Sequence, residues 1–106
     1  MYGDILPYVI EVMQEEEILA EKIRAIYTRH KARDLYDLYK LLLVGTRFDR
    51  DMADRKLAYY ELSFDTMKFL SKCETLQAGW NTELKSILEI VPLYQEVIEE
   101  VKKKII

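Results

Sequence analysis

The sequence has few residues that interrupt helices or bind metals: its 106 residues include three glycines, two prolines, one cysteine and one histidine. Because Cys73 is the single cysteine, an intramolecular disulfide is excluded, and one cysteine with one histidine cannot form a tetrahedral zinc site unaided. No apolar run reaches the roughly 18 residues of a membrane helix, and the acidic start "MYGDILPYVIE" lacks a basic leader. We expect a cytoplasmic protein with no metal site and no membrane segment.

The charge balance also limits the partners of the chain. The net charge is -3 and the isoelectric point is about 5.2. A surface that is cationic overall, as in many nucleic-acid-binding proteins, is therefore excluded, although a local basic patch is compatible with these values. An anionic partner would have to bind at a focused site.

The scarcity of glycine and proline predicts long helices with short connections. We expect a mainly α fold, a compact bundle of about five to six helices with one short N-terminal β-strand. The chain is short enough to be a single helical domain over residues 1–106. Within it, residues 1–13 are a strand-like lead-in and residues 14–106 form the bundle.

The strand is predicted from "ILPYVIEVM", a run rich in β-branched residues. A single strand leaves its backbone N–H and C=O groups unpaired, so it needs a second strand. That strand can come from another copy of the chain or from sequence that this chain lacks. We therefore predict a homodimer formed through residues 6–13.

Hydrophobic periodicity places a first helix at about 14–29 and a second at about 33–45, and the second is apolar on nearly all sides and so expected at the centre. Later helices are predicted from residues that suit helix starts. Asp49 can cap a third helix, Ser63 or Asp65 a fourth, and Asn81 a fifth, while Pro92 suits the first turn of the last helix.

Charged residues lie on or beside the apolar faces of the first two helices. Lys22 and Arg29 flank the apolar arc of the first helix, and Asp34 and Asp37 lie on an apolar side of the second. Carboxylates in apolar surroundings need partners, which Lys22, Arg29 and Arg33 can provide. The group could be a structural ion network, or a site where cations hold phosphates and an aspartate orients a hydroxyl or metal-bound nucleotide. Spacing leaves both interpretations open.

The segment "EEEILAEKIRAIYTRHKARDLYDLYKLL" resembles the AbiEii/AbiGii family of nucleotidyltransferase toxins, known from abortive infection and toxin-antitoxin systems. The resemblance rests on a Glu-Lys-hydrophobic-x-Ala-hydrophobic run and an Arg-Asp-hydrophobic-x-Asp-Leu run. These are Glu21, Lys22, Ile23, Ala25 and Ile26, then Arg33, Asp34, Leu35, Asp37 and Leu38. The resemblance implies that the chain is the C-terminal helical part of such a toxin. It implies that Lys22 contacts nucleotide phosphate, that Asp34 serves the catalytic site, and that Arg29, Arg33 and Asp37 position them.

The resemblance also implies a nucleoside triphosphate and magnesium for the complete enzyme, an antitoxin, and tRNA as a partner of the complete enzyme alone. In the family a Gly-Ser loop and an acidic pair precede this region. The nearest segment here is "GTRFDRD", whose Asp49 and Asp51 follow the glycine too closely to form such a site. We therefore expect no cofactor and no nucleotidyl transfer in the isolated chain, and a separate catalytic core as a missing partner.

Two alternatives belong to other classes of protein. Arg24 and His30 match the short Arg-to-His spacing of HEPN-type RNases, in which histidine acts as acid or base. Eight tyrosines and the lone strand suit a non-enzymatic interaction or dimerisation module. Tyr59, Tyr60 and Tyr94 are nevertheless expected at the edge of the core, and Trp80 between helices.

Overall fold

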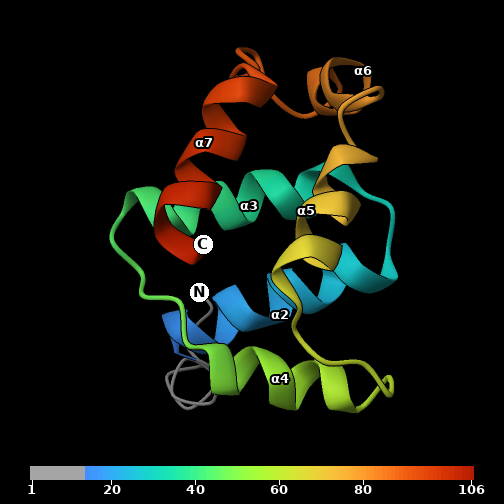
Figure 1. Ribbon diagram of the computed structural model, residues 1–106. Helices are drawn as coiled ribbons and strands as arrows, with labels where there is room; N and C mark the ends of the chain where they lie inside the picture. Colours follow the sequence, from blue (N-terminus) through green and yellow to red (C-terminus); the bar gives the residue numbers. More distant parts are fainter. Residues whose placement is uncertain (1–13) are drawn as a thin grey trace, which may run out of the picture.

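The computed structural model describes residues 14–106 and shows a compact globule of six helices, labelled as in Figure 1. They are α2 (Glu15–Thr28), α3 (Ala32–Leu43), α4 (Arg50–Ala58), α5 (Thr66–Glu74), α6 (Trp80–Lys85) and α7 (Tyr94–Ile105). The predicted helical class and number of helices are confirmed for these residues, which contain no strand. The strand predicted at residues 6–13 lies outside them. Over the same described range, no helix has the length and apolar character needed to cross a membrane.

The centre of the molecule is the pair formed by α2 and α3, on which the other helices pack (Figure 1). α2 also contacts α4 and α5, and α3 also contacts α6 and α7. The predicted central position of the second helix is confirmed, and α2 shares it. α3 ends at Leu43 because the chain turns at Gly45 with φ of 95°, and Leu43 and Val44 are exposed.

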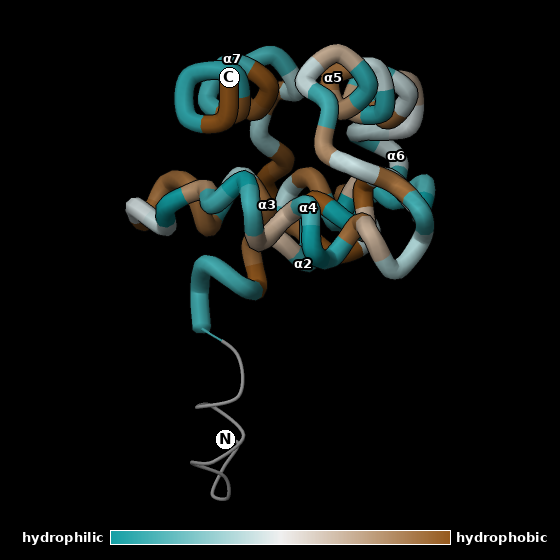
Figure 2. Tube along the Cα trace, turned by 60° about the horizontal axis from the view of Figure 1, so that its bottom comes forward, coloured by the Kyte–Doolittle hydropathy of each residue, from teal (hydrophilic) through white to brown (hydrophobic). Residues whose placement is uncertain are grey.

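The core is a continuous set of apolar side chains between the helices. Leu19 and Ile23 of α2 meet Leu35, Leu38 and Leu42 of α3 in its middle, and all five are fully buried. Each such side chain contributes about 1.5–3 kcal/mol on burial. In Figure 2 the hydrophobic side of α7 turns toward the rest of the molecule, and its hydrophilic side turns away. The apolar face of each helix thus decides which way the helix is turned.

Short polar side chains start two of the helices as predicted. Asp49 accepts a hydrogen bond of 3.2 Å from the Met52 N–H, and Asp65 accepts one of 2.8 Å from the Lys68 N–H. The prediction for Asn81 is wrong, because α6 already begins at Trp80 after Gly79.

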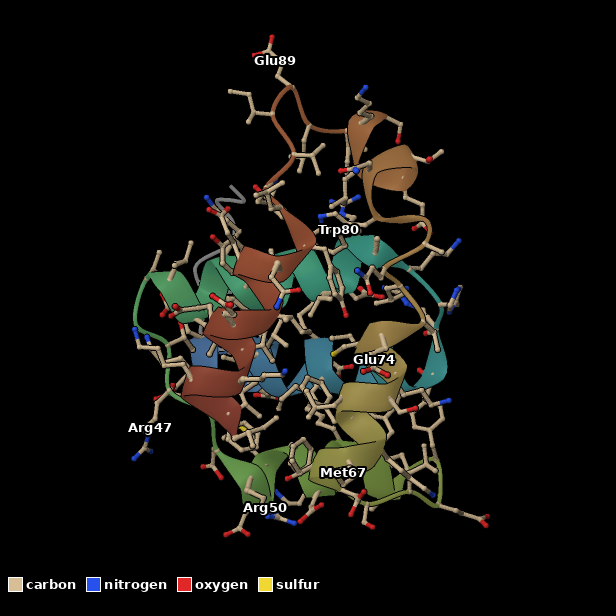
Figure 3. The ribbon with its side chains drawn as sticks, turned by 45° about the horizontal axis from the view of Figure 1, so that its top comes forward. Arg47, Arg50, Met67, Glu74, Trp80 and Glu89 are labelled. Carbon is tan, nitrogen blue, oxygen red and sulfur yellow. The ribbon has the colours of Figure 1, made fainter. Side chains whose placement is uncertain are left out.

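The prediction for Pro92 is also wrong, because α7 begins two residues later at Tyr94. The Pro92 carbonyl instead accepts a hydrogen bond of 2.8 Å from Trp80 Nε1. This bond fixes the loop before α7 on the buried indole, which is 2 % exposed and points into the molecule in Figure 3. The expected position of Trp80 between helices is confirmed.

The tyrosines divide into two groups. Tyr94 lies at the core edge as expected: its ring packs edge-on against Trp80, with centroids 5.7 Å apart, and its hydroxyl donates to the Cys73 carbonyl. Tyr59 and Tyr60 do not lie at the core edge, since their side chains are 86 % and 51 % exposed. α4 ends at Ala58, so both tyrosines fall in the turn that follows it and not on its buried face.

Candidate functional site

The site lies where the chain passes from α2 to α3. Three residues separate these helices, and the first of them, Arg29, has an extended backbone with φ of −124°. Its side chain returns along the first turn of α3. There the guanidinium donates from Nη2 to Asp34 Oδ1 at 2.7 Å and from Nε to Asp34 Oδ2 at 3.2 Å. Such paired hydrogen bonds fix both partners in orientation as well as in distance.

Lys22 and Arg33 extend this pair into a cluster. Lys22 Nζ lies 2.9 Å from Asp37 Oδ2 and 3.9 Å from Asp34 Oδ1, so it lies between the two carboxylates. Arg33 Nε lies 3.8 Å from Asp37 Oδ2. The five residues that the sequence singled out therefore meet in space, and we call them the α2–α3 ion cluster. Lys22 of α2 contacts both aspartates of α3, so the predicted pairing across the two helices is confirmed. The contact of Arg33 with Asp37 lies within α3.

The carboxylate of Asp34 is the buried member of the α2–α3 ion cluster. Its side chain is 2 % exposed, whereas the side chains of Arg29 and Arg33 are 54 % and 69 % exposed. The hydrogen bond to Asp34 raises the pKa of Arg29, and the charge of Asp34 adds to this effect. The cluster thus holds a buried carboxylate inside and presents two guanidinium groups to solvent.

A cavity of about 270 Å³ opens beside the cluster. It is lined by Ile18, Glu21, Lys22, Arg24, Ala25, Arg29 and Asp34. A neighbouring hollow of about 510 Å³ shares two of these side chains and is lined by Glu21, Arg24, Lys56, Tyr59 and Tyr60. The two hollows therefore adjoin each other along α2, between the ion cluster and the turn after α4.

Glu83 is a residue of this region that the sequence did not indicate. Its Oε1 accepts a hydrogen bond of 2.9 Å from the Ala32 N–H, which is the first of α3. A Cβ added at Gly79 would lie 3.2 Å from Glu83 Oε2, so the glycine leaves room for this carboxylate. No local pattern could reveal the contact, because Glu83 and Ala32 are 51 positions apart. Glu83 holds the turn that carries Arg33 and Asp34.

The residues of the RNase alternative contact different parts of the fold. Arg24 hydrogen-bonds to Glu21 and Thr28 on its own helix. His30 is exposed, and its Nδ1 lies 3.4 Å from the Thr75 hydroxyl, just beyond α5. The structure gives each of the two residues its own partners and does not pair them with one another.

The ion cluster suits phosphate better than it suits a metal ion. Within residues 14–106, no three His, Cys, Asp or Glu side chains are grouped so that they could hold a metal. Asp34 and Asp37 already have cationic partners at 2.7 and 2.9 Å. The magnesium that the resemblance implies therefore does not fit these side chains, whereas the exposed cations match phosphate oxygens in charge and donor geometry.

Comparison with known proteins identifies the family of the chain. The sequence model of the family described as "Nucleotidyl transferase AbiEii toxin, Type IV TA system" matches residues 2–102. No curated protein and no solved structure matches the chain. The match covers nearly all of the sequence and includes both helices that carry the cluster. The chain belongs to the AbiEii family of nucleotidyltransferase toxins from type IV toxin-antitoxin systems, and this membership implies an antitoxin as its counterpart.

Proposed function

We propose that the α2–α3 ion cluster binds the phosphates of a nucleoside triphosphate, and that the chain serves as the C-terminal helical part of an AbiEii-type nucleotidyltransferase. The observation that carries this proposal is the geometry around Asp34. The Asp34 side chain is 2 % exposed and binds Arg29, whose side chain is 54 % exposed. A guanidinium has five N–H donors, and the bonds of Arg29 to Asp34 use only Nε and Nη2, so this half-exposed cation keeps other donors available for an anion.

In this proposal each residue has its own part. Lys22 and the two arginines, Arg29 and Arg33, donate to phosphate oxygens, because a triphosphate carries more negative charge than the single carboxylates they now contact. Asp37 keeps Lys22 near the site through their 2.9 Å contact. Asp34 then has oxygen lone pairs available for the hydroxyl of an acceptor. The acceptor, which the resemblance suggests is tRNA, would meet this site in the complete enzyme.

Phosphate binding can be tested on the chain itself by calorimetry with inorganic tripolyphosphate. We expect the variants Lys22→Met, Arg29→Gln and Arg33→Gln each to bind about tenfold more weakly, since a charge-assisted hydrogen bond contributes about 1.5–3 kcal/mol. Arg47→Gln is the matched control, because Arg47 is an exposed arginine that follows the opposite end of α3 and points away from the body of the molecule (Figure 3). If the three cluster variants bind tripolyphosphate as well as this control does, the proposal is wrong.

Dimerisation through residues 6–13 is a second proposal, supported by the β-branched pattern of that segment. It corresponds to the alternative in which the chain acts as an interaction module without enzymatic activity. Sedimentation of the whole chain should show a dimer that becomes a monomer when Ile10→Pro removes a backbone donor. A dimer that survives this change would place the interface on the helices.

A further inference from the structure

Tyr59 and Tyr60 form an aromatic surface that the packing of the fold does not account for. Their exposed fractions are 86 % and 51 %, the former being the highest of any large hydrophobic side chain in residues 14–106. They lie in the turn after α4, which is closed by hydrogen bonds from Glu61 N–H to Ala58 O and from Leu62 N–H to Leu57 O. The turn thus leaves both tyrosine side chains exposed, and Tyr60 lies beside Arg24 of α2.

Arg24 of α2 covers part of this surface in a fixed orientation. Its guanidinium lies over the Tyr60 ring, with Cζ 5.4 Å from the ring centroid. The same guanidinium donates to Glu21 Oε1 from Nε at 2.9 Å and from Nη2 at 2.6 Å, and to the Thr28 hydroxyl from Nη1 at 3.0 Å. Three hydrogen bonds and one aromatic face therefore hold the guanidinium plane before any ligand arrives.

The tyrosines border the hollow that adjoins the ion cluster. Glu21 and Arg24 line both cavities, so an elongated ligand can lie along α2 from Arg29 to Tyr60. Lys56 forms the far wall and is tied to α2 by contacts of 2.9 Å to Glu17 and 3.2 Å to Glu21. Anionic groups are favoured at the cluster end of this path, and flat apolar rings at the tyrosine end.

Nucleotides combine these two properties. Aromatic side chains and arginine planes bind unpaired bases by stacking, and stacking tolerates any base because every base has a π-face. We propose that Tyr59, Tyr60 and Arg24 form a stacking subsite for a nucleobase whose phosphates lie toward the α2–α3 ion cluster. The inference rests on the proposed phosphate site, and it adds the contact to the base. The base can be that of the nucleoside triphosphate or an unpaired base of a polynucleotide acceptor.

The subsite is tested with the whole chain and three probes: inorganic tripolyphosphate, the ordinary ribonucleoside triphosphates, and a short single-stranded RNA with hydroxyl ends. The variants are Tyr59→Leu and Tyr60→Leu, which remove the ring, and Tyr59→Phe and Tyr60→Phe, which keep it. Tripolyphosphate has no base, so all four variants should bind it as the unaltered chain does. This also checks that the variants are folded.

We expect the leucine variants to lose about tenfold in affinity for a probe that carries a base, and the phenylalanine variants to lose little, since stacking needs only the ring. A loss seen with triphosphates assigns the subsite to the base of the nucleotide, and a loss confined to RNA assigns it to the acceptor. Unchanged affinity of the leucine variants for both probes overturns the inference and leaves the phosphate site intact. Absence of tripolyphosphate binding by the unaltered chain is a separate result, which counts against the phosphate site.

Discussion

The guanidinium of Arg29 holds the carboxylate of Asp34 by two hydrogen bonds, of 2.7 and 3.2 Å, although Arg29 lies outside both helices. Arg29 is the first residue of the connection and Asp34 lies in the first turn of α3. The pair therefore links the two ends of the connection between the central helices. The same contact therefore ties the connection to α3 and forms part of the candidate site.

The contribution of the buried carboxylate can be measured by urea unfolding of Asp34→Ala. We expect the free energy of unfolding to fall by about 2 kcal/mol, because the substitution removes the charge-assisted hydrogen bonds that Arg29 makes to a buried carboxylate. Asp37→Ala should cost less, since the Asp37 side chain is 29 % exposed. The control Glu89→Ala removes an exposed loop carboxylate and should change stability by less than about 0.5 kcal/mol. A cost for Asp34→Ala no larger than that of the control would show that the pairing contributes nothing.

Lys56 should make stability depend on pH in two windows. Its hydrogen bond to Glu17 raises the pKa of Lys56 above the ordinary value of 10.5, so its contribution is complete below that pH and is lost as the pH rises through the folded-state pKa. Burial raises the pKa of Glu21, but hydrogen bonds from Arg24 and Lys56 outweigh it, and the net pKa lies below 4.5. The Glu21 contribution is thus complete above that pH and is lost as the pH falls through the folded-state pKa.

We therefore expect Lys56→Met to lower the free energy of unfolding by about 1 kcal/mol at neutral pH, and by less at both extremes. Denaturant titrations at acid, neutral and alkaline pH measure this difference. Lys85→Met, which changes an exposed lysine of α6, serves as the control and should give a small difference at every pH. A Lys56→Met effect that is the same at all three pH values would contradict the attribution of this pH dependence to the contacts of Lys56 with Glu17 and Glu21.

Glu61 should be replaceable by glycine with a gain in stability. It has φ of 59°, a left-handed conformation that costs a residue with a side chain about 1–2 kcal/mol. α3 ends in the same hydrogen-bonded turn but has Gly45 at the equivalent place, with φ of 95°. The larger entropy of glycine in the unfolded chain offsets part of this gain, so Glu61→Gly should raise the free energy of unfolding by about 0.5–1 kcal/mol.

The reverse change, Gly45→Ala, is the matched control for Glu61→Gly. A Cβ at Gly45 would meet no atom within 4 Å, so any loss of stability must come from the backbone conformation. We expect a loss of about 1 kcal/mol by thermal or urea unfolding. Equal signs for the two substitutions would mean that the left-handed conformation is not what decides stability at these turns.

The thiol of Cys73 should not react with thiol reagents in the folded protein. Burial raises the pKa of its thiol to about 12, and the charge of Glu74 adds to this effect. Because the thiolate is the reactive form, a thiol reagent at neutral pH should label Cys73 only as fast as the protein unfolds. Rapid labelling without denaturant, at a rate that denaturant does not increase, would show that the thiol is accessible.

The features that could be predicted from the sequence are those set by neighbouring residues. Asp49 and Asp65 start helices because a short carboxylate reaches the backbone N–H three residues ahead, and both hydrogen bonds are present in the structure. The ion cluster could be predicted because Lys22, Asp34 and Asp37 fall on helix faces set by a period of 3.6 residues. Whether these residues bind nucleotide is a prediction that binding experiments must decide.

The features that were missed depend on contacts between distant parts of the chain. Arg24 meets Tyr60 because α4 packs on α2, and Trp80 binds the Pro92 carbonyl because the loop before α7 turns back over α6. The exposure of Tyr59 follows from where α4 ends, which a single residue can shift. Apolar periodicity identifies which side of a helix is buried, but it does not identify the helix that covers it.

Glu83 connects α6, the shortest helix of residues 14–106, to the start of the central helix α3. α6 has six residues, and its carboxylate accepts the hydrogen bond of the Ala32 N–H. Short helices open more often than long ones, and each opening of α6 would free this amide to exchange its hydrogen with solvent. Deuterium uptake at Ala32 therefore measures how often α6 detaches, and Glu83→Gln should speed that uptake while the amides in the middle of α3 keep their protection.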